Sequence, residues 1–146
     1  MKKMLRMYAA LGFLLASTSW ADAPHGGRIL ESDGIRAEFF VNEAREVELR
    51  FLGDEHEVES VGERRASAIV VHASERTELS FEAKGDALVS TAALPDGDGY
   101  TIVVRIATRE GEKPRNFRIA YHAEACDECN RPEYACICEH SEHGGH

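Results

Sequence analysis

Residues 28–123 alternate between apolar and polar side chains with a period of two. Such alternation is typical of strands that bury one face and expose the other. The apolar series are Ile35, Ala37, Phe39 and Val41; Val47, Leu49 and Phe51; Leu79 and Phe81; Tyr100, Ile102, Val104 and Ile106; and Phe117, Ile119 and Tyr121. The residues between them, including Glu38 and Phe40, are expected on the solvated face. A continuous apolar run, Ile69 to Val71, predicts a strand packed on both sides.

Turn-forming residues separate these runs. Clusters rich in glycine, aspartate and proline occupy residues 32–34, 53–54, 84–86, 95–99 and 110–112. Seven or eight short strands at this spacing predict an all-β fold, an antiparallel β-sandwich of the immunoglobulin-like type. No segment after the first 21 residues has the pattern of a convincing amphipathic helix.

The first 21 residues have the layout of a secretory signal peptide. Basic residues precede a short apolar run, residues 7–16, and small residues follow it up to Ala21 and Ala23. We expect cleavage after Ala21, with Ala23 as the alternative. The apolar run is too short for a comfortable membrane span, and no later segment approaches that length. The sequence therefore predicts a periplasmic or secreted protein without a membrane span after cleavage.

Net charge narrows the choice of partner. The whole chain carries a formal charge of −9, and three of its 17 basic residues but none of its 26 acidic ones lie in residues 1–21. The remainder, with 14 basic and 26 acidic residues, carries −12. Such a charge repels nucleic acid and anionic lipid and attracts cations. We therefore expect no nucleic-acid partner.

The chain divides into four parts on these grounds. A signal peptide at 1–21 is followed by a linker at 22–27, a β-sandwich domain at 28–123 and a Cys/His-rich tail at 124–146. About 125 residues remain after cleavage, enough for one modest hydrophobic core. All four cysteines and three of the seven histidines lie in the last 21 residues.

The tail has the composition of a metal site. Its candidate ligands are Cys126, Cys129, Cys136, Cys138, His140, His143 and His146. Two cysteines three positions apart can face one ion from a single turn of backbone. Thiolate suits Zn(II) and Cu(I), whereas imidazole suits Zn(II), Cu(II) and Ni(II). The sequence predicts a Cu or Zn site with four primary thiolate ligands and three auxiliary histidines.

A second copper ligand is predicted in the linker. His25 is followed by Gly26 and Gly27, so an imidazole precedes two unhindered amides that can wrap Cu(II) in a square of nitrogen atoms. The same three residue types occur at 143–145. Glycine pairs also form plain flexible linkers, which is the competing interpretation.

Disulfides are the main alternative to metal. An even number of cysteines in an exported chain often forms bridges, which here would have to join the two motifs because cysteines one residue apart pair badly. The alternative function is thus a disulfide-stabilised interaction or structural domain of the cell envelope. An enzyme is not expected, because no nucleophile has a recognisable base partner and no glycine-rich phosphate loop follows a strand. A thioredoxin-like role is disfavoured by the acidic Asp127 and Glu128 between two thiols.

Parts of residues 24–105 resemble a known group of proteins. The segments are Pro24 to Leu30, Gly85 to Val89, and Leu94-Pro95 leading into Tyr100 to Arg105. They resemble small exported bacterial β-sandwich proteins that accompany heavy-metal efflux systems of the resistance-nodulation-division type. The resemblance implies metal handling in the periplasm, with an efflux adaptor or another envelope protein as partner. It carries over only His25 as a ligand, and the cysteine tail departs from the group's pattern.

Overall fold

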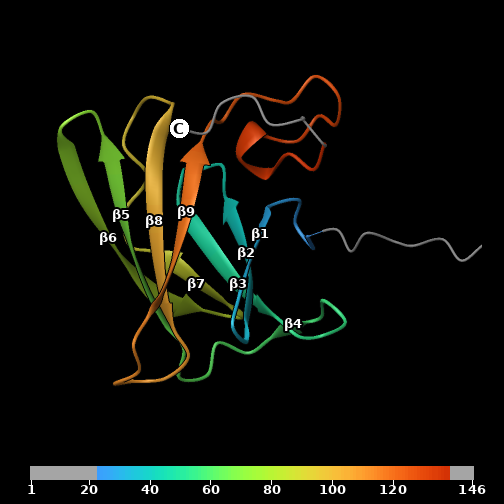
Figure 1. Ribbon diagram of the computed structural model, residues 1–146, viewed down its shortest axis with the longest axis vertical. Coiled ribbons are helices and arrows are strands. Elements are labelled where there is room, and N and C mark those ends of the chain that lie inside the picture. The colour runs from blue at the N-terminus through green and yellow to red at the C-terminus, as the bar shows by residue number, and fades with distance from the viewer. Residues whose placement is uncertain (1–22, 139–146) are drawn as a thin grey trace, which may run out of the picture.

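The computed structural model describes residues 23–138, and these are built almost entirely of antiparallel strands (Figure 1). In chain order the elements are β1 Arg28–Ser32, β2 Ile35–Val41, β3 Val47–Leu52, β4 Val58–Glu59, β5 Arg65–His72, β6 Glu75–Lys84, β7 Ala87–Ser90, β8 Tyr100–Ala107, β9 Arg115–Tyr121 and the 3-10 turn η1 Glu133–Ala135. The predicted all-β, antiparallel fold is confirmed. Within the described range no helix is long and apolar enough to cross a membrane.

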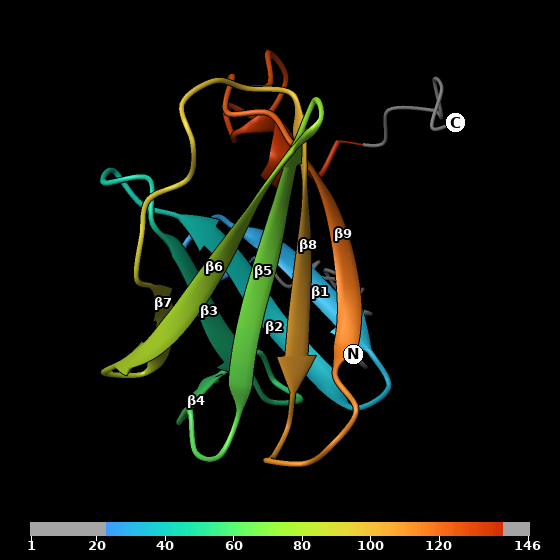
Figure 2. The same cartoon turned by 90° about the vertical axis from the view of Figure 1, so that its left-hand side faces the viewer.

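The strands follow one path that folds into two layers. Hydrogen-bonded neighbours run in the order β1-β2-β3-β7-β6-β5-β8-β9, with β4 paired to β3. Strand β6 belongs to both layers, because its residues up to Ser80 pair with β5 and those from Phe81 onward pair with β7. Figure 2 shows β6, β5, β8 and β9 in front of β1, β2 and β3, which cross them at an angle.

The core lies between the two layers and uses the residues that the alternation assigns to it. Side chains of every predicted series are buried there, among them Phe39, Leu49, Phe51, Ile102 and Ile119. Paired strands place them opposite one another, as with Phe39 and Leu49 on β2 and β3. The period of two therefore identifies the buried face of each long strand.

Two details of burial differ from the sequence prediction. Glu38, expected on the solvated face of β2, is fully buried, because the segment before β1 covers it. On β5, Val70 alone of the run Ile69 to Val71 is fully buried, and its two neighbours are half-buried on the outer face. Within the described residues, that run is therefore packed on one side only.

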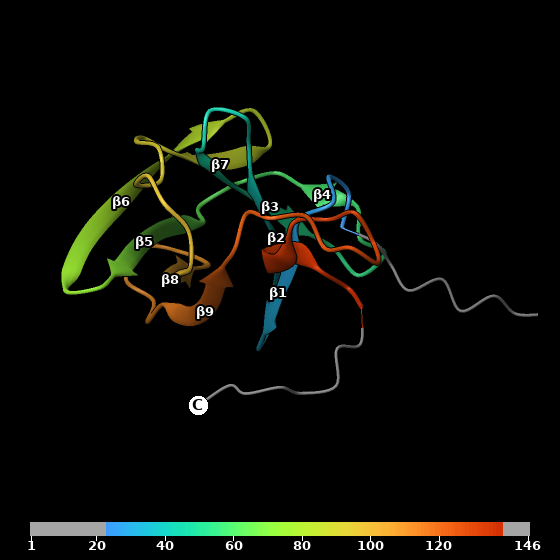
Figure 3. The same ribbon diagram turned by 90° about the horizontal axis from the view of Figure 1, so that it is seen from above.

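The two ends of the strand path, β1 and β9, approach each other at one end and diverge at the other. The first residue of β9, Arg115, lies 3.9 Å from the carboxylate of Asp33 just after β1. At the opposite end, η1 contacts both β1 and β9. Seen from above, η1 lies beside the ends of these strands (Figure 3). The sheet is thus nearly closed, and η1 contacts both of its edges at the end where they diverge.

Candidate metal centre

The first two cysteines lie in a hairpin that continues from β9. The two arms are joined by hydrogen bonds from Tyr134 N to His122 O (3.1 Å) and from Glu133 N to Glu124 O (2.8 Å). An isolated bridge between Ala125 and Pro132 extends this pairing toward the loop. The chain that leaves β9 therefore returns to its starting point within about a dozen residues and brings the second pair of cysteines back toward the first.

The loop of this hairpin holds Cys126 and Cys129. The Cys126 amide donates to Arg131 O (2.7 Å), and the Asn130 amide donates to Cys126 O (2.9 Å). Asn130 has φ of 57°, a left-handed conformation that asparagine tolerates better than most residues. This turn closes the loop directly after Cys129. Cys126 is 1 % exposed and so belongs to the folded interior.

The second pair follows η1. Pro132 precedes the turn, and Cys136 directly after it is extended, with φ −61° and ψ 133°. In extended chain alternate side chains share a face, so Cys136 and Cys138 can point to one side while Ile137 points to the other. Ile137 is accordingly 60 % exposed. The Cys138 amide lies 3.4 Å from Cys136 Sγ and donates a hydrogen bond to it.

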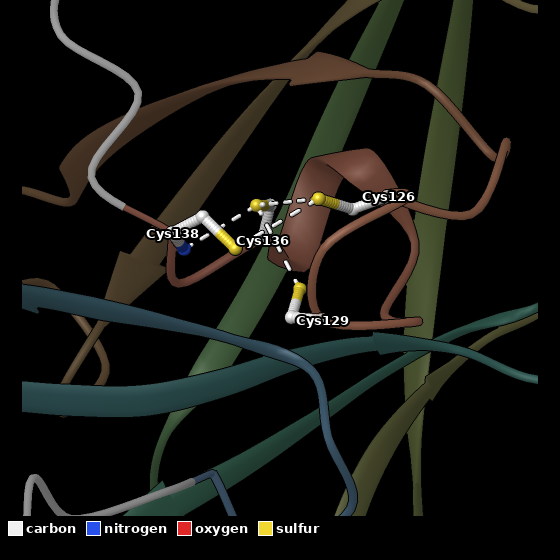
Figure 4. A group of neighbouring side chains, drawn as sticks. All are labelled: Cys126, Cys129, Cys136 and Cys138. Carbon is white, nitrogen blue, oxygen red and sulfur yellow. Dashed lines mark hydrogen bonds between the residues drawn. The ribbon is translucent and has the colours of Figure 1, made fainter.

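The four sulfur atoms converge on one point (Figure 4). All four Sγ atoms lie within 4.8 Å of one another. Three separations are 3.3 Å for Cys126 and Cys136, 3.8 Å for Cys129 and Cys136, and 3.9 Å for Cys126 and Cys138. A tetrahedral ion with bonds of about 2.3 Å to sulfur places its ligands about 3.8 Å apart. The cluster therefore has nearly the dimensions of a four-thiolate site.

No disulfide joins the four cysteines in this arrangement. A disulfide requires a sulfur–sulfur distance of about 2.05 Å, well below the separations above. Burial and the neighbouring sulfur atoms raise the pKa of the Cys136 and Cys138 thiols above its usual range. Several thiolates cannot share this volume without a compensating positive charge, and a bound cation supplies one.

His25 lies in a different environment from the cysteines. Its Nδ1 is 2.9 Å from Glu38 Oε2, and the His25 and Gly27 amides donate to Glu38 Oε1 at 2.7 and 2.9 Å. Two of the nitrogen groups that the predicted copper motif offers, the His25 imidazole and the Gly27 amide, are thus engaged by one buried carboxylate. The His25 ring lies against Phe40, with ring centroids 6.3 Å apart. Binding of Cu(II) by these nitrogens would have to displace Glu38.

Among residues 23–138, the four cysteines form the one group of three or more potential ligands that converge within reach of a single ion. His25 is not in that group. The predicted auxiliary ligands His140, His143 and His146, like the predicted signal peptide, lie outside the described residues.

Sequence reasoning missed two residues that position the site and the linker. Tyr134, between the two cysteine motifs, is 3 % exposed and belongs with Ala135 to the hydrophobic core. An aromatic residue in an otherwise polar tail was the available signal. Glu38 gave no signal, because strand alternation assigned it to solvent.

Comparison of the chain with protein-family models, with curated proteins and with solved structures finds no match. The arrangement of the cysteines is therefore the basis on which a function is argued.

Proposed function

We propose that the protein binds one thiophilic metal ion through Cys126, Cys129, Cys136 and Cys138. The observation that carries the proposal is the convergence of four sulfur atoms, with three of the six separations between 3.3 and 3.9 Å and none beyond 4.8 Å. The two motifs contain every cysteine of the chain, and all four thiols meet at one place. Chance proximity is a poor explanation for this convergence.

Zinc is the ion that fits best. Four sulfur ligands in a tetrahedral arrangement suit Zn(II), which has no competing geometric preference and forms closed four-coordinate sites. Cu(I) is the second candidate, because thiolates are soft ligands that also select it. His140, His143 and His146 would act as a separate, weaker set of ligands, and His25 as a further copper ligand.

We further propose that this is a binding protein of the bacterial periplasm that serves heavy-metal resistance or efflux, without catalytic activity of its own. The support is the leader-like start of the chain, its net charge of −12 without that leader, and its resemblance to exported proteins that accompany efflux systems. An efflux adaptor or another envelope protein would then be the partner.

A disulfide-stabilised envelope domain is the second candidate function. The favouring observation is that the sulfur atoms of Cys126 and Cys136, from different motifs, lie 3.3 Å apart. Oxidation would need a shift of about 1 Å to join them. Exported proteins meet an oxidising environment in which such bridges persist.

Metal content and thiol state, measured together on protein purified from the periplasm, distinguish the two functions. The metal proposal predicts one ion per chain and four thiols that react with a thiol reagent only after chelation. Two bridges with no metal would establish the disulfide function. Protein that stays metal-free when reduced and supplied with excess zinc or copper would end the metal proposal.

A further inference from the structure

Tyr134 connects the hairpin of residues 122–134, here called the metal hairpin, to both ends of the strand path. Its ring stacks on Tyr121, the last residue of β9, with centroids 5.4 Å apart, and meets Phe39 of β2 edge-on at 5.6 Å. Its carbonyl accepts a long hydrogen bond (3.5 Å) from Arg28, the first residue of β1. The side chain of Tyr134 therefore contacts β9 and β2, and its backbone carbonyl contacts the start of β1, at the end where the two edge strands diverge.

The phenol of Tyr134 also completes the hydrogen bonding of β2. Register between β1 and β2 begins with Arg28 opposite Phe39, so Val41 lies beyond the end of β1. The Val41 amide donates instead to Tyr134 Oη at 3.0 Å. The tail thereby supplies a partner to a backbone amide that the sheet itself leaves unpaired, and buried amides without partners are costly.

The same short segment holds the metal ligands. Tyr134 is one residue from the end of η1 and two residues before Cys136, while its amide is tied to His122 at the base of the hairpin. Tyr134 offers no sulfur or nitrogen to the cluster, and its oxygen is used by Val41. Any effect of this residue on metal binding must therefore pass through the placement of the cysteines.

We propose that metal binding and insertion of Tyr134 between the sheet edges are a single coupled equilibrium. The bound ion then stabilises the contacts of Tyr134 with both ends of the strand path and so closes the β-sandwich. This inference rests on the proposed function, because it requires an ion at the four cysteines. By linkage, whatever stabilises the inserted tyrosine strengthens metal binding, and bound metal stabilises the insertion by the same factor. A fraction of the molecules with the tyrosine withdrawn lowers the apparent affinity in proportion.

The first test measures zinc affinity by competition with a chelating indicator, using the reduced full-length chain. Tyr134→Ala should weaken zinc binding by about 10-fold or more, within the range usual for coupled sites. Tyr134→Phe keeps the ring but loses the bond to Val41, and should weaken binding less than Tyr134→Ala. The control is Val70→Ala on β5, which lowers stability by a core cavity and should leave zinc affinity within about 2-fold.

The second test needs no substitution. Amide hydrogen exchange resolved by residue should show that zinc slows exchange at Val41 and Arg28 more than at Ile102 in the middle of β8. In Tyr134→Phe this extra protection of Val41 should disappear, even though zinc still binds. Should Tyr134→Ala fail to fold, Tyr134→Phe and the exchange data decide the question.

Two outcomes would overturn the inference. Zinc that binds tightly while protecting only residues 124–138 would show that the ion holds the hairpin and not the sheet edges. Equal zinc affinities for wild type, Tyr134→Ala and Val70→Ala would show the same. An unaltered chain that takes up neither zinc nor copper would instead contradict the proposed function, so the two failures are distinguishable.

Discussion

At the scale of single residues, Glu38 combines complete burial with complete satisfaction of its carboxylate. Its oxygen atoms accept hydrogen bonds from the His25 and Gly27 amides and contact the His25 ring. Gly27 is required there, since a Cβ at this position would lie 2.3 Å from Phe39 O. A buried carboxylate is stabilised by such partners, whereas a neutral group in its place accepts weaker hydrogen bonds from the same amides.

Glu38→Gln should destabilise the fold by about 2–3 kcal/mol, because hydrogen bonds to charged groups each contribute about 1.5–3 kcal/mol and the neutral amide oxygen accepts weaker ones from the His25 and Gly27 amides. Urea unfolding at pH 7 measures the change. Glu31→Gln is the matched control: Glu31 pairs with Arg36 on the surface, its side chain is 61 % exposed, and its loss should cost below about 1 kcal/mol. Equal effects of both substitutions would contradict the assigned role of Glu38.

Cys138 and Ile137 are adjacent residues for which the structure predicts opposite effects on metal binding. Cys138→Ser removes one sulfur from the cluster and should weaken zinc binding by more than about 100-fold, since even residues outside the ligand set can cost about 10- to 100-fold. Ile137→Ser alters an exposed side chain that points away and should have little effect. Competition with a chelating indicator measures both, and similar affinities for the two variants would refute the ligand assignment.

At the scale of elements, alternation identified the strands well because each long strand buries one face against the opposite layer. It could not locate the passage of β6 between the layers, since Ser80 and Phe81 continue the same period while their partner strand changes. It also missed η1, because a three-residue turn carries no periodic signal. The burial of Glu38 was missed for a further reason: the segment that covers it lies outside the strand.

Asp98 joins the loop before β8 to the base of the metal hairpin. Hydrogen bonding from the Ala123 amide (2.7 Å) and contact with the His122 ring (3.3 Å) hold the pKa of Asp98 below its usual value. Because the folded-state pKa is the lower one, the carboxylate stabilises the fold above the unfolded value of about 3.9, and this contribution is lost as pH falls through the folded-state value.

Asp98→Asn should therefore lower stability slightly at pH 7, by below about 1 kcal/mol since the side chain is partly exposed, and the difference from wild type should shrink as the pH is lowered below 4. Urea midpoints at pH 7 and at pH 3 measure it. Asp96→Asn in the same loop, where the side chain is exposed, is the control for the substitution itself at both pH values. A deficit of Asp98→Asn that stayed constant with pH would show that its carboxylate charge is not what holds the hairpin base.

At the scale of the whole molecule, the described part of the chain begins close to the predicted cleavage site. Ala23 is 7 % exposed, and its carbonyl accepts a hydrogen bond from the Gly26 amide at 3.0 Å. Cleavage after Ala23 would remove this turn, whereas cleavage after Ala21 preserves it. The intact mass of exported protein should therefore correspond to a chain that begins at Asp22. A mass that corresponds to Pro24 as first residue would contradict this role for Ala23.

The composition of the tail predicted the four cysteines as candidate ligands but not how the tail joins the rest of the molecule. Spacing alone indicated that Cys126 and Cys129 can face one ion. The return of Cys136 to within 3.3 Å of Cys126 depends on the hairpin and on Tyr134, which are tertiary features. Tyr134 and Ala135 of the predicted tail also share the core of the sheet. Composition and spacing did not predict this.

Four sulfur atoms of one chain are proposed to form a single tetrahedral site. Zinc K-edge X-ray absorption of the reduced, zinc-loaded full-length protein examines this site itself. A four-cysteine site predicts one zinc per chain with four sulfur neighbours at about 2.3 Å. A first shell that contains two or more nitrogen or oxygen neighbours near 2.0–2.1 Å would contradict it, because the ion would then be held by other residues than the four cysteines.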